Sequence, residues 1–390
     1  MLHEYIEKIR PHFEEGGKLK AFRSVFDGFE TFLLVPNTTS KSGVSIHDAI
    51  DSKRIMSFVV IALMPALLFG MYNIGLQHYS YIHTEASHLT MFLYGLCITL
   101  PKIVVSYAVG LGIEFTVAQW KHEEIQEGYL VTGMLIPMIV PVNCPLWMLA
   151  LAVAFSVIFA KEIYGGTGMN IFNPALVARA FLFFAYPSKM SGDKVWISTD
   201  QVFGMGKDLD VVSSATPLGQ AANTAFENSA EFLGSMDFSS YVIGTMPGSI
   251  GETSVIAILI GAFILLWTKI ASWRTMVSVF IGGAVVGFLF NVAGPQTTIA
   301  QIPWYDHLVL GGFCFGAVFM ATDPVTSCRT EKGKYIYGFL IGALAITIRV
   351  LNPGYPEGMM LAILFMNVFA PTIDYCFVNN NINKRLKRAK

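Results

Sequence analysis

Thr216 is a hydroxyl residue that a bulky group could approach closely. It lies in the segment 210–217, which reads Asp-Val-Val-Ser-Ser-Ala-Thr-Pro. A residue before proline is pushed out of the helical region toward extended backbone, so Thr216 is expected on a non-helical segment. The residues just before it, Ser213, Ser214 and Ala215, are small. They would leave the threonine hydroxyl open to a large partner.

A glycine-rich stretch at 165–175 holds two amide side chains, Asn170 and Asn173. Glycine lets the backbone approach a ligand, and the spacing of the two asparagines places both amides on one face of a helical turn. Such groups suit a planar heterocycle that forms hydrogen bonds. The alternative is that the Asn-Pro-Ala at 173–175 only starts a membrane helix. Both interpretations stay open at this point.

The composition is that of an integral membrane protein. Hydrophobic residues make up 54% of the 390 residues, charged residues 14%, and the mean hydropathy is +0.55; soluble domains rarely reach these values. The formal net charge of -1 gives no reason to expect nucleic acid or an acidic substrate. The five cysteines show no CxxC or paired spacing, so neither a disulfide framework nor a metal site (zinc or iron–sulfur) is indicated within this chain.

Ten apolar segments are candidates for membrane-spanning helices, which need roughly 20 apolar residues each. They lie at 55–76, 90–113, 129–142, 145–160, 168–187, 253–268, 275–293, 307–322, 336–351 and 358–378. Lys and Arg collect on the cytoplasmic side of a membrane, and both ends of the chain are rich in them. Both termini are therefore expected in the cytoplasm. The long polar loop, with seven acidic residues against three lysines, is expected on the outer side.

The five segments before this loop and the five after it resemble two copies of one unit. Five crossings per copy force opposite orientations, as in transporters built around broken helices near the midplane. Segments interrupted by Gly or Pro point to a binding site or a permeation path, and here these are the third, fifth, eighth and tenth. The expected fold class is an all-α polytopic membrane protein: about ten transmembrane helices, arranged as two inverted five-helix repeats with broken or re-entrant helices.

This organisation divides the chain into five parts. They are a cytoplasmic, amphipathic N-terminal segment (1–54), the first five-helix repeat (55–187), the outer loop (188–251), the second five-helix repeat (252–378) and a basic cytoplasmic tail (379–390). The N-terminal segment could lie on the membrane or cover the helix bundle.

Several ionisable side chains fall within or beside the apolar segments, where each costs roughly a few kcal/mol or more. They are Lys102, Glu114, Glu127, Glu162, Arg179, Asp323, Arg349 and Asp374. Those near segment ends could extend to the membrane interface instead. Arg179 and Asp374 are deeper. They indicate either an ion path or a structural pair of arginine with carboxylate.

Four stretches make the chain similar to a known family. They are 165–175 (GGTGMNIFNPA), 179–187 (RAFLFFAYP), 320–325 (MATDPV) and 352–360 (NPGYPEGMM). Over essentially its whole length the chain resembles the NqrB/RnfD family, which supplies membrane subunits to the sodium-translocating NADH:quinone oxidoreductase and to the Rnf ferredoxin:NAD oxidoreductase. The N-terminal segment, with Asp-Ser-Lys-Arg-Ile-Met at 51–56, looks like the sodium-pump branch.

The resemblance implies two flavins. A flavin transferase would attach FMN through its phosphate to Thr216, as a phosphoester to threonine. The family pattern is close to Asp-x-x-Ser-Gly-Ala-Thr, and residues 210–216 match it except that Ser214 stands in place of the glycine. The resemblance also implies a non-covalent riboflavin at Asn170 and Asn173. It places a quinone near residues of the cytoplasmic face, which here are Asp51, Lys53, Arg54, Gly110, Glu114, Glu127, Gly128 and Tyr129.

On this resemblance we expect a membrane subunit of a multi-subunit NADH:quinone reductase in the bacterial cytoplasmic (inner) membrane. With the other subunits and the membrane lipid around it, it would pass electrons from FMN through riboflavin to ubiquinone or menaquinone while sodium is exported. Glu162 and Asp374 are candidates for the ion path. The alternatives are an Rnf-type subunit with a ferredoxin partner, and a non-redox channel or transporter on the same inverted repeat.

Overall fold

The computed structural model describes residues 2–13, 52–121, 128–210, 212–352 and 354–389, together with positions 23, 26, 28, 30 and 34. The described residues form helices and no β-strand, apart from an isolated antiparallel β-bridge between Val202 and Met205. The α-helices are α1 (Leu2–Ile9), α3 (Ser52–Tyr81), α4 (His88–Lys121), α5 (Tyr129–Ile139), α6 (Leu146–Ser156), α7 (Pro174–Ala185), α8 (Pro187–Met190), α9 (Pro217–Asn223), α10 (Ser229–Ser235), α11 (Phe238–Ile243), α12 (Val255–Trp267), α13 (Trp273–Ala293), α14 (Thr298–Gln301), α15 (Trp304–Val309), α16 (Phe313–Phe315), α17 (Glu331–Leu351) and α18 (Met359–Ala389).

Among the described residues, six helices are long and apolar enough to cross a membrane: α3, α4, α6 with its extension to Tyr164, α13, α17 and α18. Three more apolar helices, α5, α7 and α12, are shorter. A helix passes into π-helical geometry twice, at η3 (Val157–Lys161), which continues α6, and at η6 (Gly316–Met320), which continues α16. The chain is therefore an all-α, multi-pass membrane protein, as its composition predicts.

The short helices are not long enough to cross a membrane alone. α5 and α7 have 11 and 12 residues, or about 16 and 18 Å of helix, against a hydrocarbon core of roughly 30 Å. These are the third and fifth segments, and the eighth, α16 with η6, is short as well. The prediction that the tenth segment is interrupted is wrong. α18 runs unbroken through Pro371, because neighbouring groups can satisfy the backbone that a proline frees in a membrane helix.

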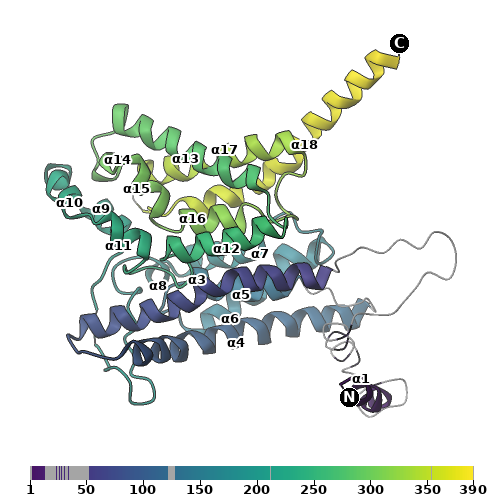
Figure 1. Ribbon diagram of the computed structural model, residues 1–390, viewed down its shortest axis with the longest axis horizontal. Helices are drawn as coiled ribbons and strands as arrows, with labels where there is room; N and C mark the ends of the chain where they lie inside the picture. Colours follow the sequence, from purple (N-terminus) through teal and green to yellow (C-terminus); the bar gives the residue numbers. More distant parts are fainter. Residues whose placement is uncertain are drawn as a thin grey trace.

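The two halves of the chain run in opposite directions (Figure 1). Their first helices, α3 and α12, pack against each other as an antiparallel pair. An added Cβ at Gly261 of α12 would lie 2.3 Å from the carbonyl oxygen of Ala62, whereas one at Gly70, later in α3, would lie 1.8 Å from that of Ile250, which precedes α12. Within the halves, α4 packs on α6 and α13 packs on α17. Close backbone contact at glycine thus holds the inverted halves together.

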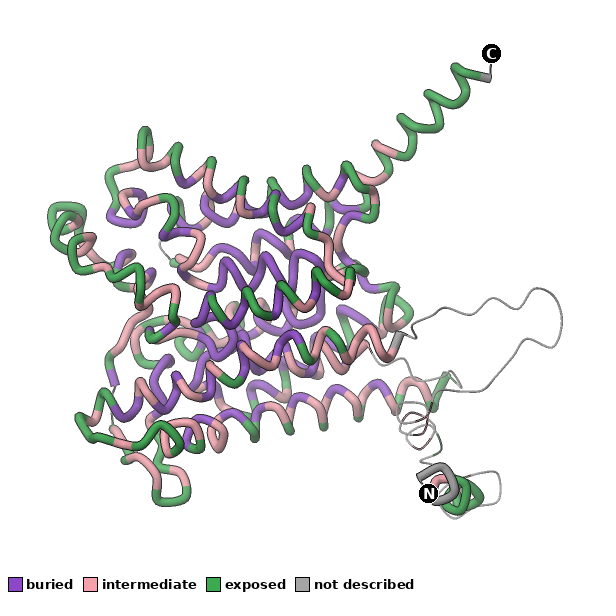
Figure 2. Tube along the Cα trace, viewed as in Figure 1, coloured by how far each residue is buried: buried purple, intermediate pink, exposed green. Residues whose placement is uncertain are grey.

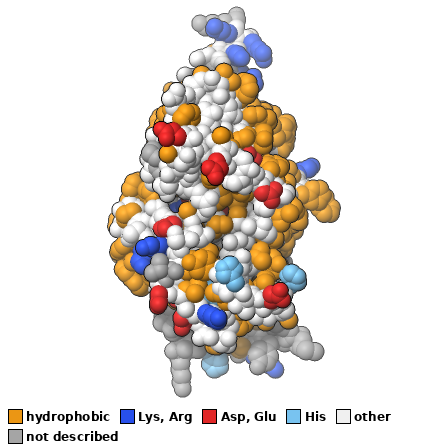
Figure 3. All heavy atoms as spheres, turned by 90° about the vertical axis from the view of Figure 1, so that its left-hand side faces the viewer, with side chains coloured by type: hydrophobic (Ala, Val, Ile, Leu, Met, Phe, Trp, Pro, Cys, Tyr) orange, Lys and Arg blue, Asp and Glu red, His pale blue; other side chains and the backbone are white. Residues whose placement is uncertain are grey.

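The start of α3 and the end of α18 lie at one end of the bundle, which we call the terminal end, and the segment 188–251 lies at the other, the loop end (Figure 1). This agrees with an even number of crossings. Buried residues concentrate in the middle, whereas the last turns of α18 are exposed (Figure 2). Acidic side chains are spread over the loop end (Figure 3).

We expect Gly342→Leu to separate α13 from α17. A Cβ at Gly342 would lie 2.0 Å from the carbonyl oxygen of Val279, and backbone cannot rotate away as a side chain can. The protein purified in detergent should lose at least about 1–3 kcal/mol of stability, measured as a lower thermal midpoint. Gly112→Ala in α4 is the control, since nothing lies within 4 Å of its Cβ. Equal losses in the two variants would contradict this packing.

Candidate functional site

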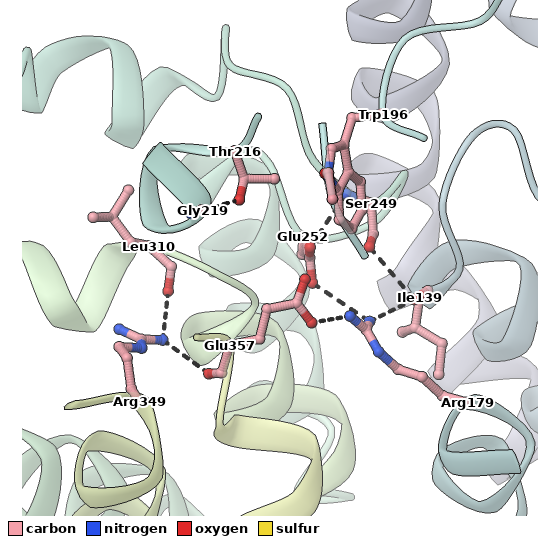
Figure 4. Close-up of polar contacts among 11 residues, drawn as sticks. Ile139, Arg179, Trp196, Thr216, Gly219, Ser249, Glu252, Leu310, Arg349 and Glu357 are labelled. Carbon is pink, nitrogen blue, oxygen red and sulfur yellow. Dashed lines mark hydrogen bonds and ion pairs between the residues drawn. The ribbon is translucent and has the colours of Figure 1, made fainter. Parts of the chain in front are cut away.

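Thr216 lies at the loop end, immediately before α9. Its backbone is extended, with φ -61° and ψ 156°, so the conformation predicted from the following proline is confirmed. The side chain caps the helix: Oγ1 accepts a hydrogen bond from the backbone N–H of Gly219 at 3.2 Å (Figure 4). The residue is half-buried. Its hydroxyl is thus held in one orientation at the edge of the bundle.

The turn before Thr216 is tied to Asp193. The backbone N–H of Ser214 donates to the Asp193 carbonyl oxygen at 2.7 Å, and the Ser213 hydroxyl donates to the Asp193 carboxylate at 2.6 Å. The latter bond lowers the pKa of the Asp193 carboxyl below its usual value. Among the described residues other than glycine, positive φ occurs at His83, Phe203 and Lys269. Ser214 is therefore not in a conformation that requires the family's glycine.

A buried network of charges lies beside Thr216 and joins the two halves (Figure 4). Arg179 of α7 forms an ion pair with Glu357, which precedes α18, and its Nη1 lies 3.8 Å from Glu252, which precedes α12. Arg179 also donates to the carbonyl oxygen of Ile139, the last residue of α5. Its side chain is only 3% exposed. The structural arginine–carboxylate pair considered for Arg179 therefore exists, with carboxylates other than Asp374.

Arg349 extends this network from α17. Its guanidinium donates to the carbonyl oxygens of His307 at 2.6 Å, Leu310 at 3.0 Å and Glu357 at 3.3 Å. A small cavity beside the network is lined by Thr216, Glu252 and Glu357 among others. Glu252 and Glu357 are not among the predicted site residues, because each lies just outside an apolar segment. Glu357 does fall inside one of the four stretches that carry the family resemblance, so a signal for it was present.

Asp374 lies in α18 and contacts the turn before α17. Its carboxylate accepts hydrogen bonds from the backbone N–H of Arg329 at 2.7 Å, from the backbone N–H of Thr330 at 3.0 Å and from the Thr330 hydroxyl at 2.5 Å. Thr330 is itself the N-cap of α17. Asp374 thus holds the start of one long helix against another. Glu162, the other ion-path candidate, lies 3.8 Å from Lys121.

Asn170 and Asn173 line a second cavity, of about 90 Å³, together with residues at the start of α3. Asn173 caps α7, since its Oδ1 accepts from the N–H of Ala175 at 3.0 Å, and its Nδ2 donates to Asp323 at 3.4 Å. Asn170 donates to the carbonyl oxygen of Phe172 at 3.0 Å. Asn173 therefore starts a membrane helix and also lines a cavity, whereas the binding of a heterocycle by this stretch stays a prediction.

The chemistry of this cavity fits the polar edge and flat faces of a flavin. The hydroxyl oxygen of Thr167 is buried and has no hydrogen-bond partner, so it could serve a ligand. The two asparagine amides offer donors and acceptors, and Val131, Leu135 and Phe319 supply apolar walls. A three-ring heterocycle occupies more space than the cavity offers, so binding requires the walls to widen.

The residues expected near a quinone meet beside the same cavity. Gly110 lies against Tyr129, because an added Cβ would come within 1.9 Å of the ring. The Tyr129 hydroxyl donates to the carbonyl oxygen of Ser106 at 2.9 Å. Glu114 forms an ion pair with Lys161, which lines the cavity together with Gly128.

Of the other four residues in the expected set, the structure describes two. Lys53 and Arg54 are half-buried at the start of α3, whereas Asp51 and Glu127 lie outside the described residues. The structure therefore places Gly128 on the cavity wall with Asn170 and Asn173. Glu114 reaches that wall through its ion pair with Lys161, and Gly110 packs against Tyr129, which follows Gly128.

A larger groove of about 1080 Å³ lies between α6 and α7 on one side and α17 and α18 on the other. Aromatic and aliphatic side chains line it, among them Phe155, Phe181 and Phe365. It contains no charged side chain that could act on a substrate, so we do not assign chemistry to it.

The chain matches the family model described as the NQR2, RnfD, RnfE family over residues 39–383. It is 44% identical to the B subunit of the Na(+)-translocating NADH-quinone reductase from Chromohalobacter salexigens, over 98% of this chain and 95% of that protein. The proteins of the same name from Klebsiella pneumoniae and Pseudoalteromonas atlantica are 43% and 42% identical, each over 99% of both chains.

We expect Glu357→Gln to destabilise the protein strongly. It removes a carboxylate from a buried ion pair and leaves the Arg179 guanidinium without its closest counter-charge, which typically costs about 3–5 kcal/mol. The thermal midpoint of the purified protein measures the loss. Glu331→Gln is the matched control, because its pair with Arg274 is solvent-exposed, at 35% and 58% for the two side chains, and such pairs contribute little. If Glu357→Gln were as stable as Glu331→Gln, the buried ion pair would contribute no more to the stability of the protein than the exposed one.

Proposed function

The chain belongs to the NQR2, RnfD, RnfE family, and we propose on that premise that it is the B subunit of a sodium-translocating NADH:quinone reductase. In this role the chain carries FMN as a phosphoester on Thr216 and holds riboflavin with Asn170 and Asn173. It delivers electrons to a quinone near Gly110 and Tyr129. A flavin transferase matures it, and the other subunits supply electrons from NADH.

The observation that carries this proposal is the separation of the two sites. Thr216 lies at the loop end, and the cavity lined by Asn170 and Asn173 borders the start of α3 at the terminal end. Carriers held at the two ends of the bundle would let an electron cross much of the membrane within this chain, and the protein would orient each carrier for that transfer. We place the loop end outside the cell and both termini in the cytoplasm, with the bundle in the bacterial inner membrane.

Sodium export in this proposal is powered by electron transfer. Moving one charge against roughly 150 mV costs about 3.5 kcal/mol, at ~2.3 kcal/mol per 100 mV, so each electron must release a comparable free energy on its way to quinone. Glu162 and Asp374 remain our candidates for the ion path. Of the two, Glu162 directly follows Lys161 at the cavity and is the better placed to sense its contents.

Covalent flavin on Thr216 is testable by fluorescence of the denatured protein. When the chain is produced together with a flavin transferase, we expect a fluorescent wild-type band in a denaturing gel and no fluorescence from Thr216→Ala. Thr216→Asn should also be dark. Asparagine keeps the helix cap as well as threonine does, so its failure isolates the missing hydroxyl.

Thr224→Ala is the control for this experiment. It removes a second threonine hydroxyl, at the other end of α9, whose Oγ1 donates to the Gln220 carbonyl oxygen. This variant should fluoresce like the wild type. A dark wild-type band, or a fluorescent Thr216→Asn band, would refute attachment at Thr216.

The riboflavin site is testable with Asn173→Asp. The variant keeps an oxygen to cap α7 but loses the amide donor and places a second carboxylate beside Asp323. We expect riboflavin to bind about tenfold more weakly, a loss of ~1.4 kcal/mol, measured as riboflavin released by acid from the purified complex. The FMN on Thr216 should be unchanged and serves as the internal control. Equal riboflavin affinity in variant and wild type would place the site elsewhere.

A further inference from the structure

Lys161 is a buried cation on the wall of the cavity that Asn170 and Asn173 line. Its side chain is 4% exposed, and its ammonium group pairs with the carboxylate of Glu114 in α4. The Lys161 Nζ also lies 5.8 Å from the centre of the Tyr129 ring. Of the residues that line the cavity, two are charged, Lys161 and Asp323. Lys161 is therefore the positive charge closest to whatever the cavity holds.

The backbone at this wall is unusual in both halves of the protein. The first π-helical segment, η3, ends at Lys161, and the second, η6, contributes Phe319 to the same cavity. Thr322 and Asp323, which also line it, lie two and three residues after the end of η6. Insertions of π geometry into α-helices occur mostly at functional sites. Their coincidence here is independent of the charges and marks the same place.

We propose that Lys161 sets the redox potential of the flavin in this cavity and that Glu114 positions Lys161 and partly cancels its charge. The inference rests on the proposed function, since it takes the cavity as the riboflavin site. A flavin held here would gain negative charge on reduction, with the FMN proposed on Thr216 as the electron donor. Lys161 stabilises that charge from a buried position, where little solvent screens it.

The two charges predict shifts of opposite sign. Lys161→Gln removes the stabilising cation, so the bound flavin becomes harder to reduce and its midpoint potential falls. Glu114→Gln leaves the cation uncompensated, so the potential rises. If the ion pair only held the end of α6 to α4, the two substitutions would break the same contact. Their effects on the potential would then not differ in sign.

The test uses the whole purified complex. The midpoint potential of the non-covalent flavin is measured by spectroelectrochemical titration in wild type, Lys161→Gln, Glu114→Gln and Lys161→Arg, and the riboflavin content of each is measured by acid extraction. Lys161→Arg keeps the charge and should titrate close to wild type. Lys102→Gln is the control. This variant neutralises a different buried lysine, which lies in α4 and donates to the carbonyl oxygens of Pro141 and Val142. Lys102 lies about 18 Å along α4 from Glu114. Lys102→Gln should leave the potential unchanged.

The outcomes separate the two proposals. A wild-type complex with no extractable riboflavin overturns the proposed function and this inference together. Bound riboflavin with unshifted potentials, or with shifts of the same sign in Lys161→Gln and Glu114→Gln, overturns only the role of Lys161. If Lys161→Gln loses its flavin, Glu114→Gln decides, since its potential must rise. Loss of flavin from both variants assigns the pair a structural role and rejects the inference.

Discussion

A helix that ends inside a membrane leaves backbone carbonyl groups that need hydrogen-bond donors, and much of this structure supplies them. In the hydrocarbon core no water satisfies the carbonyl groups at a helix end, so the protein must supply donors itself. Here buried cations do so. Arg179 donates to Ile139 at the end of α5, Lys102 to the carbonyls just after it, and Arg349 to Leu310 at the end of α15. Burying these cations costs free energy. Their hydrogen bonds to the otherwise unpaired carbonyl oxygens at the helix ends offset that cost.

The same cations connect the two inverted halves. Arg179 comes from the first half and finds its carboxylates in segments of the second. Because a buried charge without its partner is expensive, the halves cannot move apart at the loop end without replacing these contacts. The terminal end is built differently, since Glu114 and Lys161 both belong to the first half. Among the described residues, the buried ion pairs that cross between the halves thus lie at the loop end, and the buried pair at the terminal end stays within one half.

Much of this organisation could be predicted from the sequence. The apolar segments, the extended backbone of Thr216 and the glycine-rich approach to α7 follow from local rules on hydropathy, proline and helix capping. The partners of the charged residues could not, because Arg179 meets Glu357 across 178 positions. The continuous α18 escaped prediction for a related reason. Gly354 and Gly358 lie before the helix instead of within it, and the sequence pattern does not distinguish a broken helix from a helix that starts late.

The length of α18 has a consequence for the lipid around the protein. Its 31 residues span about 46 Å, well beyond a hydrocarbon core of roughly 30 Å, and its last turns carry Lys384, Arg385, Lys387 and Arg388. With the terminal end in the cytoplasm, as proposed, these four cations lie within reach of the headgroup layer, where anionic phospholipids attract each of them by about 1 kcal/mol. Anionic lipid in the inner leaflet would then hold the end of α18 at the membrane surface.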